Sequence, residues 1–174
     1  MRAFKTAADI RAARRLILAN LEDADTPLLL EEAVPIAREI FVAIHIEGAR
    51  RRPEILIAPQ AAATVDELVR LVRIPVEPAD PPTPEAISAA VAKLFPPDLA
   101  ARLARYAARL PDIARHEDLE LLEINPLALT GDDRLIACNV KIVRDDNADF
   151  RNDPQEFPIS RALAQRALTR QPAS

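Results

Sequence analysis

Glycine is scarce in this sequence: the 174 residues include two, Gly48 and Gly131. Loops that hold a nucleotide's phosphates against main-chain N–H groups need several closely spaced glycines, as in the Rossmann and P-loop motifs. Two isolated glycines cannot build such a loop. The sequence therefore excludes an enzyme that binds phosphate on its own glycine-rich loop, unless another chain supplies that loop.

Cysteine is also scarce, and long apolar runs and an excess of positive charge are missing. A single cysteine, Cys138, rules out a disulfide framework and a thiolate zinc site within one chain. No apolar run approaches the roughly 18 residues of a membrane-spanning helix, and the N-terminus lacks the apolar core of a signal peptide. The net charge of −4 argues against a nucleic-acid partner. We expect a cytoplasmic protein that binds neither membranes nor nucleic acid.

The rest of the composition is ordinary for a globular protein of about one domain, with 49% hydrophobic and 29% charged residues. Alternating or apolar stretches at 36–48 and 55–59 predict strands of an antiparallel sheet with one buried face. Further strands are expected at 1–5, 27–33 and 72–78, a polar loop at 21–27, and helices at 7–20, 64–72, 84–95, 98–111 and 160–170. The predicted fold class is α+β, an antiparallel sheet with flanking helices.

A proline-rich segment, residues 78–84, is the best candidate for a linker between two layers of structure. It divides the chain into residues 1–77, this hinge, residues 85–158 and a tail at 159–174. Thr83 suits the N-cap of the helix that follows the hinge, because its side chain can accept a bond from a free N–H of the first turn.

The helix predicted at 98–111 is amphipathic. We expect one face, with its large apolar side chains, to be buried: Leu99, Leu103, Tyr106 and Leu110. We expect the opposite face to be solvated, with three arginines: Arg102, Arg105 and Arg109. The two histidines, His45 on a strand and His116 at a helix end, suit structural roles.

Residues 118–143 predict a β-hairpin. Alternation places four side chains on one face of its first strand: Leu119, Leu121, Glu123 and Asn125. A three-residue loop at 131–133 would set Asn125 opposite Asn139 and Glu123 opposite Lys141. The other face of the second strand is apolar and is expected in the core: Ile136, Cys138, Val140 and Ile142.

Two interpretations of the polar hairpin face stay open. It can be a solvated surface with an ordinary cross-strand ion pair. It can also be an oxygen-donor cation site beside a positive charge, because Mg²⁺ prefers one or two carboxylates together with a substrate's phosphates. Two neutral amides would bind the metal weakly, with Glu123 as the only nearby carboxylate.

Two segments resemble a known family. Residues 121–151, LLEINPLALTGDDRLIACNVKIVRDDNADFR, are similar to a signature of the succinyl-CoA synthetase β subunit and related carboxylate–CoA ligases. Residues 28–60 resemble the same family's V-E-x-A-x-D-I-A-R-E-x-Y stretch and the strand after it. The resemblance implies an ATP-grasp fold, in which two α+β lobes clasp Mg-ATP while a partner subunit carries a phosphohistidine.

The resemblance also implies roles for individual positions. Four residues match nucleotide-binding positions: Glu31, Val34, Glu39 and Lys141. Asn125 and Asn139 fall at the two magnesium-ligand positions of the family. Glu123 matches a glutamate that faces the partner's phosphohistidine loop and is the candidate catalytic residue.

The sequence departs from the family pattern at several points. Asn139 replaces a metal-binding aspartate, and residues 60–62, Gln-Ala-Ala, replace an E-G-G triplet. We expect an ATP-grasp fold truncated at both ends, because two parts of the family find no match. One is the first segment, with its glycine-rich loop and phosphate-binding lysine, and the other is the CoA-ligase domain.

Two functional hypotheses follow. The chain is one piece of a split, ADP- or GDP-forming carboxylate–CoA ligase, active only with CoA-ligase subunits that supply the glycine-rich loop and the phosphohistidine. Mg²⁺ and ATP or GTP would then bind weakly, or only with that partner. Alternatively, the chain is a non-catalytic relative that keeps the fold as an interaction or regulatory module, which the changes at Asn139 and at residues 60–62 favour. A fragment without an independent role is the remaining alternative.

Overall fold

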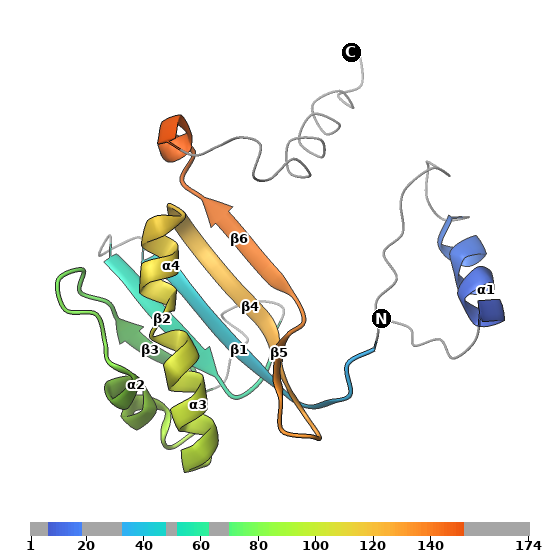
Figure 1. Ribbon diagram of the computed structural model, residues 1–174, viewed down its shortest axis with the longest axis horizontal. Helices are drawn as coiled ribbons and strands as arrows, with labels where there is room; N and C mark the ends of the chain where they lie inside the picture. The colour runs from blue at the N-terminus through green and yellow to red at the C-terminus, as the bar shows by residue number, and fades with distance from the viewer. Residues whose placement is uncertain (1–6, 19–32, 48–51, 63–69, 152–174) are drawn as a thin grey trace. The chain divides into compact units, whose positions relative to one another are not determined.

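The computed structural model describes four parts of the chain, residues 7–18, 33–47, 52–62 and 70–151 (Figure 1). Several expected elements lie wholly or mostly outside these parts: the strands at 1–5 and 27–33, the loop at 21–27, and the helices at 64–72 and 160–170. None of the helices within the four parts is long and apolar enough to cross a membrane.

The chain forms two compact units, Met1–Pro35 and Ile36–Ser174. The first unit contains α1, Ala7–Leu18, which confirms the helix expected at 7–20. Alternate apolar and basic residues give this helix two different sides, and Ala13 is buried while Arg14 is exposed.

The second unit is built on an antiparallel sheet. Its strands are β1 Ile36–Glu47, β2 Arg52–Ala58, β3 Val72–Pro75, β4 Leu119–Thr130, β5 Leu135–Ala137 and β6 Val140–Arg144. The order across the sheet is β3-β2-β1-β4-β5, and β6 also pairs with β4. The predicted antiparallel sheet is therefore confirmed, with strands at each of the described positions expected from alternation.

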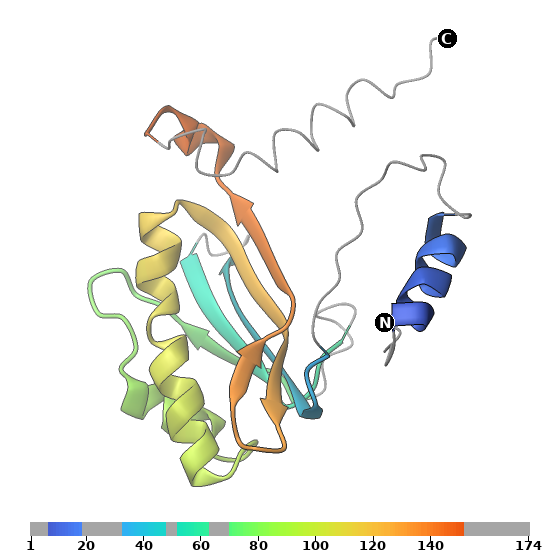
Figure 2. The ribbon, with the colours of Figure 1, turned by 45° about the vertical axis from the view of Figure 1, so that its right-hand side comes forward.

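Three helices cover one face of the sheet, as Figure 2 shows: α2 Pro84–Val91, α3 Pro97–Ala107 and α4 Leu110–His116. Ile87 of α2 and Leu103 of α3 are fully buried and belong to one apolar core with the sheet residues that face them. Thr83 caps α2 as expected, since its Oγ1 accepts from the N–H of Ala86 at 3.3 Å. The flanking helices of the predicted α+β fold are confirmed.

β1 is buried on both faces, which corrects the expectation of a single buried face. Ile40, Val42 and Ile44 belong to the core under the helices. Phe41 and Ala43 point the other way and pack in a separate cluster with Leu56 and Ala58 of β2. We call this side, opposite α2–α4, the second face of the sheet.

The single helix expected at 98–111 is two helices, α3 and α4, separated at residues 108–109. Pro111 lies in the first turn of α4, where a missing N–H costs no helical hydrogen bond. Leu99, Leu103 and Leu110 are buried as expected. Tyr106 is 57% exposed, so its expected burial is wrong.

The expectation that the apolar face of the second hairpin strand is buried in the core is also wrong in part. Cys138 is exposed, and Val140 and Ile142 are each 47% exposed. The reason is that β6 lies at the outer edge of the sheet, whereas α4 packs on β4 and β1. The alternation predicts the strand correctly, but none of the helices in the described part of the chain packs closely on it.

Residues 78–84 lead from β3 of the sheet into α2 of the helical layer. Strands from both sides of this segment, β1 and β4, pair directly with each other in one sheet. The division of the chain at residues 78–84 stays a prediction.

Candidate functional site

The hairpin of β4, β5 and β6 has the register that the sequence predicts. The N–H of Thr130 bonds to the carbonyl of Arg134 at 2.9 Å, which closes a three-residue loop at 131–133. Asp133 adopts a φ of 62°, the left-handed residue that such a loop needs. Further along, Glu123 pairs with Lys141.

Asn125 and Asn139 therefore lie opposite each other. The main-chain N–H of Asn125 donates to the carbonyl of Asn139 at 2.9 Å. The side-chain Nδ2 of Asn139 donates back to the carbonyl of Asn125 at 3.2 Å. This double contact holds the two amides at one point of the hairpin, where β5 gives way to β6.

The loop at the end of the hairpin is fixed by charged side chains. The Thr130 hydroxyl donates to Asp132 at 2.5 Å and, together with Arg134, holds the pKa of that carboxyl below its usual value. Arg102 of α3 donates to both the carboxylate and the carbonyl of Asp133, at 2.7 and 2.6 Å. The expected solvated role of Arg102 is wrong, because it links the helical layer to this loop.

Asn125 is half-buried and oriented by two contacts of its amide nitrogen. Its Nδ2 donates to the carbonyl of Ala62 at 2.7 Å and to Oε1 of Glu123 at 3.1 Å. Ala62 belongs to the Gln-Ala-Ala segment at 60–62, which is therefore directly in contact with the hairpin. Because an amide is planar, the oxygen of Asn125 points away from both acceptors.

The two amides have oxygens to offer a cation. Both Nδ2 atoms are engaged, and no described residue donates to the Oδ1 of Asn125 or of Asn139. Glu123 adds one half-buried carboxylate, and Lys141 adds an exposed ammonium across from it. No group of three or more His, Cys, Asp or Glu side chains suited to a metal occurs among the described residues. The set therefore fits Mg²⁺ that arrives with phosphate oxygens, and not Mg²⁺ held by protein alone.

The other expected nucleotide-binding residues are only partly placed. Glu39 of β1 is exposed and pairs with Ala128 of β4. Alternation along β1 puts Glu39 on the second face, together with Phe41. Val34 is half-buried in the first unit, and Glu31 lies outside the described residues.

A buried carboxylate on the second face was not found by sequence reasoning. Glu54 of β2 is 4% exposed and lies opposite His45 in the register. Oε2 of Glu54 is 3.9 Å from Nε2 of His45 and 3.5 Å from Nη1 of Arg73. The guanidinium of Arg73 offsets part of the cost of burying this carboxylate. The burial of Glu54 depends on how β2 pairs with its neighbouring strands, and the sequence of β2 alone does not show that pairing.

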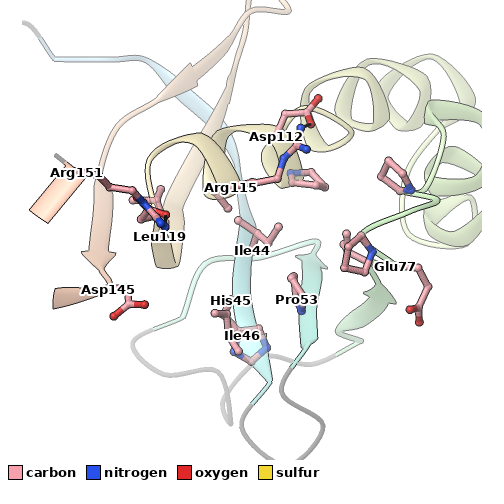
Figure 3. Close-up of a pocket in the computed structure, with 16 residues that line it drawn as sticks. Ile44, His45, Ile46, Pro53, Glu77, Asp112, Arg115, Leu119, Asp145 and Arg151 are labelled. Carbon is pink, nitrogen blue, oxygen red and sulfur yellow. Dashed lines mark hydrogen bonds and ion pairs between the residues drawn. The ribbon is translucent and has the colours of Figure 1, made fainter. Parts of the chain in front are cut away.

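A pocket lies at the opposite end of β4 from the loop and has a volume of about 490 Å³ (Figure 3). Apolar side chains such as Ile44, Pro53 and Leu119 line it. Its rim charges already have partners within the chain. These pairs are Arg115–Asp112, Arg151–Asp118 and Arg52–Glu77, and the bond to Asp118 raises the pKa of Arg151.

Neither Asn125 nor Asn139 lines this pocket, so it is separate from the hairpin site. With its charges paired and its floor apolar, it offers no cluster of free cations for phosphates. The hairpin is the better candidate for a nucleotide.

Comparison with known proteins identifies a matching family and a similar fold. A family model described as an ATP-grasp domain matches residues 22–129. The chain is 30% identical over 161 residues to the β subunit of ADP-forming succinate–CoA ligase from Zymomonas mobilis, covering 86% of this chain and 40% of that protein. It is 33% identical over 131 residues to the corresponding subunit from Desulfurococcus amylolyticus, covering 72% and 35%.

Among solved structures, ATP citrate lyase from Methanothrix soehngenii, in complex with citrate and coenzyme A, has a similar fold. The TM-score is 0.53 at 18% identity, and the match covers 74% of this chain and 29% of that one. The chain thus spans about two fifths or less of the length of the proteins it matches.

Proposed function

The chain belongs to the ATP-grasp family, and on that premise we propose that it is the magnesium–nucleotide-binding part of a carboxylate–CoA ligase that a partner chain completes. The observation that carries this proposal is the hairpin on which Asn125 and Asn139 meet beside Glu123 and Lys141. The curated relatives of similar sequence are ADP-forming succinate–CoA ligase β subunits.

The proposal that a partner chain takes part is supported by the scarcity of glycine in the sequence. The chain spans 40% of the Zymomonas subunit, and its two glycines cannot form a phosphate loop. A CoA-ligase subunit would supply that loop and the phosphohistidine. The substrate of the completed enzyme would be a small carboxylate, as the names of the relatives suggest.

Each hairpin residue has a defined task in this proposal. The Oδ1 atoms of Asn125 and Asn139 would contact Mg²⁺, which would neutralise phosphate charge when bound. Lys141 would contact a phosphate oxygen. Glu123 would keep Asn125 oriented through the 3.1 Å contact and face the partner's histidine loop.

The remaining nucleotide contacts would come from the second face of the sheet and from the segment before β1. Glu39 is exposed on that face and free to accept from a nucleotide hydroxyl or amine. By their positions in the family pattern, we also propose nucleotide contacts for Glu31, through its carboxylate, and for Val34, whose side chain has no hydrogen-bonding group.

Calorimetric titration with Mg-ATP tests this function. The chain alone should bind weakly, because the structure shows one carboxylate at the site. Binding should tighten at least tenfold, or about 1.4 kcal/mol, when a CoA-ligase-type subunit encoded beside the chain is present. Mg-GTP in a parallel titration identifies the preferred nucleotide. Absence of heat in both conditions would contradict the proposal.

A second function is favoured by the exposure of Asn139 and by the absence of a second carboxylate at the hairpin site among the residues that the structure describes. A chain that keeps the fold without binding nucleotide would serve as an interaction or regulatory module. It would bind a ligase subunit equally well with and without Mg-ATP. The same titrations separate the two functions, since only the first couples partner binding to the nucleotide.

A further inference from the structure

The pocket at the start of β4 has the size and the floor of a small-molecule site. Its volume of about 490 Å³ lies within the range of roughly 300–1,000 Å³ that is usual for such sites. The floor reaches the apolar core, because Ile44, Val76 and Leu119 line the pocket and are 2%, 3% and 7% exposed. A ligand on this floor would contact side chains that core packing already holds in place, so little ordering would accompany binding.

Prolines from three parts of the chain line the same pocket: Pro53 of β2, Pro78 and Pro81 after β3, and Pro111 of α4. A proline ring fixes φ and has few conformations to lose when a ligand packs against it. Proline rings also pack well on flat aromatic rings, as when aromatic grooves bind proline-rich peptides. None of the described residues gives this pocket a phenylalanine, tyrosine or tryptophan. The walls therefore suit an aromatic ring that a ligand supplies.

The charges around the pocket are paired with one another. Three ion pairs lie there: Arg115–Asp112 at 2.8 Å, Arg52–Glu77 at 3.0 Å and Arg151–Asp118. An ionised ligand would lose its hydration on the apolar floor and would compete with these pairs for a group of opposite charge. An uncharged ligand has neither cost and leaves the pairs intact. The electrostatics of the pocket therefore favour an uncharged occupant.

We propose that this pocket binds a small, uncharged molecule built on an aromatic ring, at a site separate from the nucleotide site. The ring contacts the core side chains of the floor and packs between the prolines of the walls, and its burial removes apolar surface of both partners from water. The proposal stands independently of the ligase function, because neither Asn125 nor Asn139 lines the pocket.

Titration of the full chain with indole, followed by nuclear magnetic resonance, tests the site. Indole is uncharged and consists of two fused rings. The methyl signals of Ile44 and Leu119 should shift to saturation, whereas the side-chain amides of Asn125 and Asn139 should stay in place. Indolecarboxylate, which adds a negative charge to the same ring system, should bind at least about tenfold more weakly because it must lose its hydration.

A variant that fills the pocket tests the same site from the protein side. Ala114 of α4 lines the pocket, so the phenyl ring of Ala114→Phe should occupy the space of the ligand and weaken indole binding at least about tenfold. Ala108→Phe is the matched control. Ala108 is also a partly buried alanine packed against the core, but it does not line the pocket, so this variant should keep the affinity of wild type.

The wild-type titration depends on no variant, so it tests the site whether or not Ala114→Phe folds. Signals that move without saturation, or shifts confined to other parts of the chain, would overturn the proposal. Equal affinity of wild type and folded Ala114→Phe for indole would also overturn it, and equal affinity for indole and indolecarboxylate would contradict the preference for an uncharged ligand.

Discussion

Substitution of Asn139 by aspartate is expected to tighten binding of Mg-ATP by about tenfold, or about 1.4 kcal/mol. The reason is that the described part of the chain supplies the site with one carboxylate, Glu123, and that carboxylate already accepts from Asn125. Magnesium favours anionic oxygen ligands, and the exposed position of Asn139 leaves room for the metal to keep its waters. Calorimetry of wild type and Asn139→Asp with Mg-ATP measures the change.

The magnesium dependence supplies the control for this variant. With EDTA present, the added negative charge lies near the phosphates without a metal between them, so Asn139→Asp should bind free ATP no better than wild type. Equal Mg-ATP affinities for the two proteins would show that the hairpin face is merely solvated. Tighter binding of free ATP by the variant would also contradict a metal role for this position.

Truncation of Leu103 to alanine is expected to lower the free energy of unfolding by about 2–5 kcal/mol. Leu103 is 1% exposed in the centre of α3 and contacts the core shared by the helices and the sheet. Removal of its side chain leaves a cavity between two layers that cannot close without moving the helix. Urea denaturation monitored by circular dichroism measures the loss.

Tyr106, on the same helix, is the matched control. It is 57% exposed, so Tyr106→Ala should cost less than about 0.5–1 kcal/mol. Equal losses for the two variants would show that α3 is rotated relative to the arrangement described here. A larger loss for Tyr106→Ala would indicate that this side chain is covered in the folded protein.

The contrast between Leu103 and Tyr106 also shows why the predicted burial of Tyr106 is wrong. The large apolar residues of the segment predict a buried face that includes Tyr106. The buried stripe consists of Leu99, Leu103 and three small residues, Ala100, Ala104 and Ala107. Alanines allow the helix to approach the sheet closely. They mark the buried face of α3, and Tyr106 lies outside that face. In an alanine-rich helix, the positions of the small residues indicate which face is buried.

The strands show a related difference. The register of the hairpin was predictable because a three-residue loop and the required pairing of polar residues left one solution. Which side would be covered was not predictable, since that depends on where the helices pack. Cys138 and Ile142 are exposed for this reason. A register shift between Leu119 and Leu121 also turns Leu119 to the helix side, away from its expected neighbours.

The sequence of β1 does contain a signal for burial on both faces. The run from Ile40 to Ile44 is apolar without interruption, which is typical of a strand covered on two sides. The contact between Asn125 and Ala62 could not be predicted from the sequence, because 63 residues separate them and no local pattern relates the two positions. The family resemblance implies which side chains belong to the candidate site, and the structure shows how Asn125 is oriented.

The most direct test of the hairpin site is a nuclear magnetic resonance titration of the chain with Mg-ATP, followed at the side-chain amides of Asn125 and Asn139. Assignments come from Asn125→Ala and Asn139→Ala. We predict that both amide signals shift together on addition of Mg-ATP, that ATP with EDTA produces smaller shifts, and that the amide of Asn147, away from the hairpin, stays in place. Shifts confined to other parts of the chain, with the signals of Asn125 and Asn139 unchanged, would contradict a magnesium–nucleotide site on this hairpin.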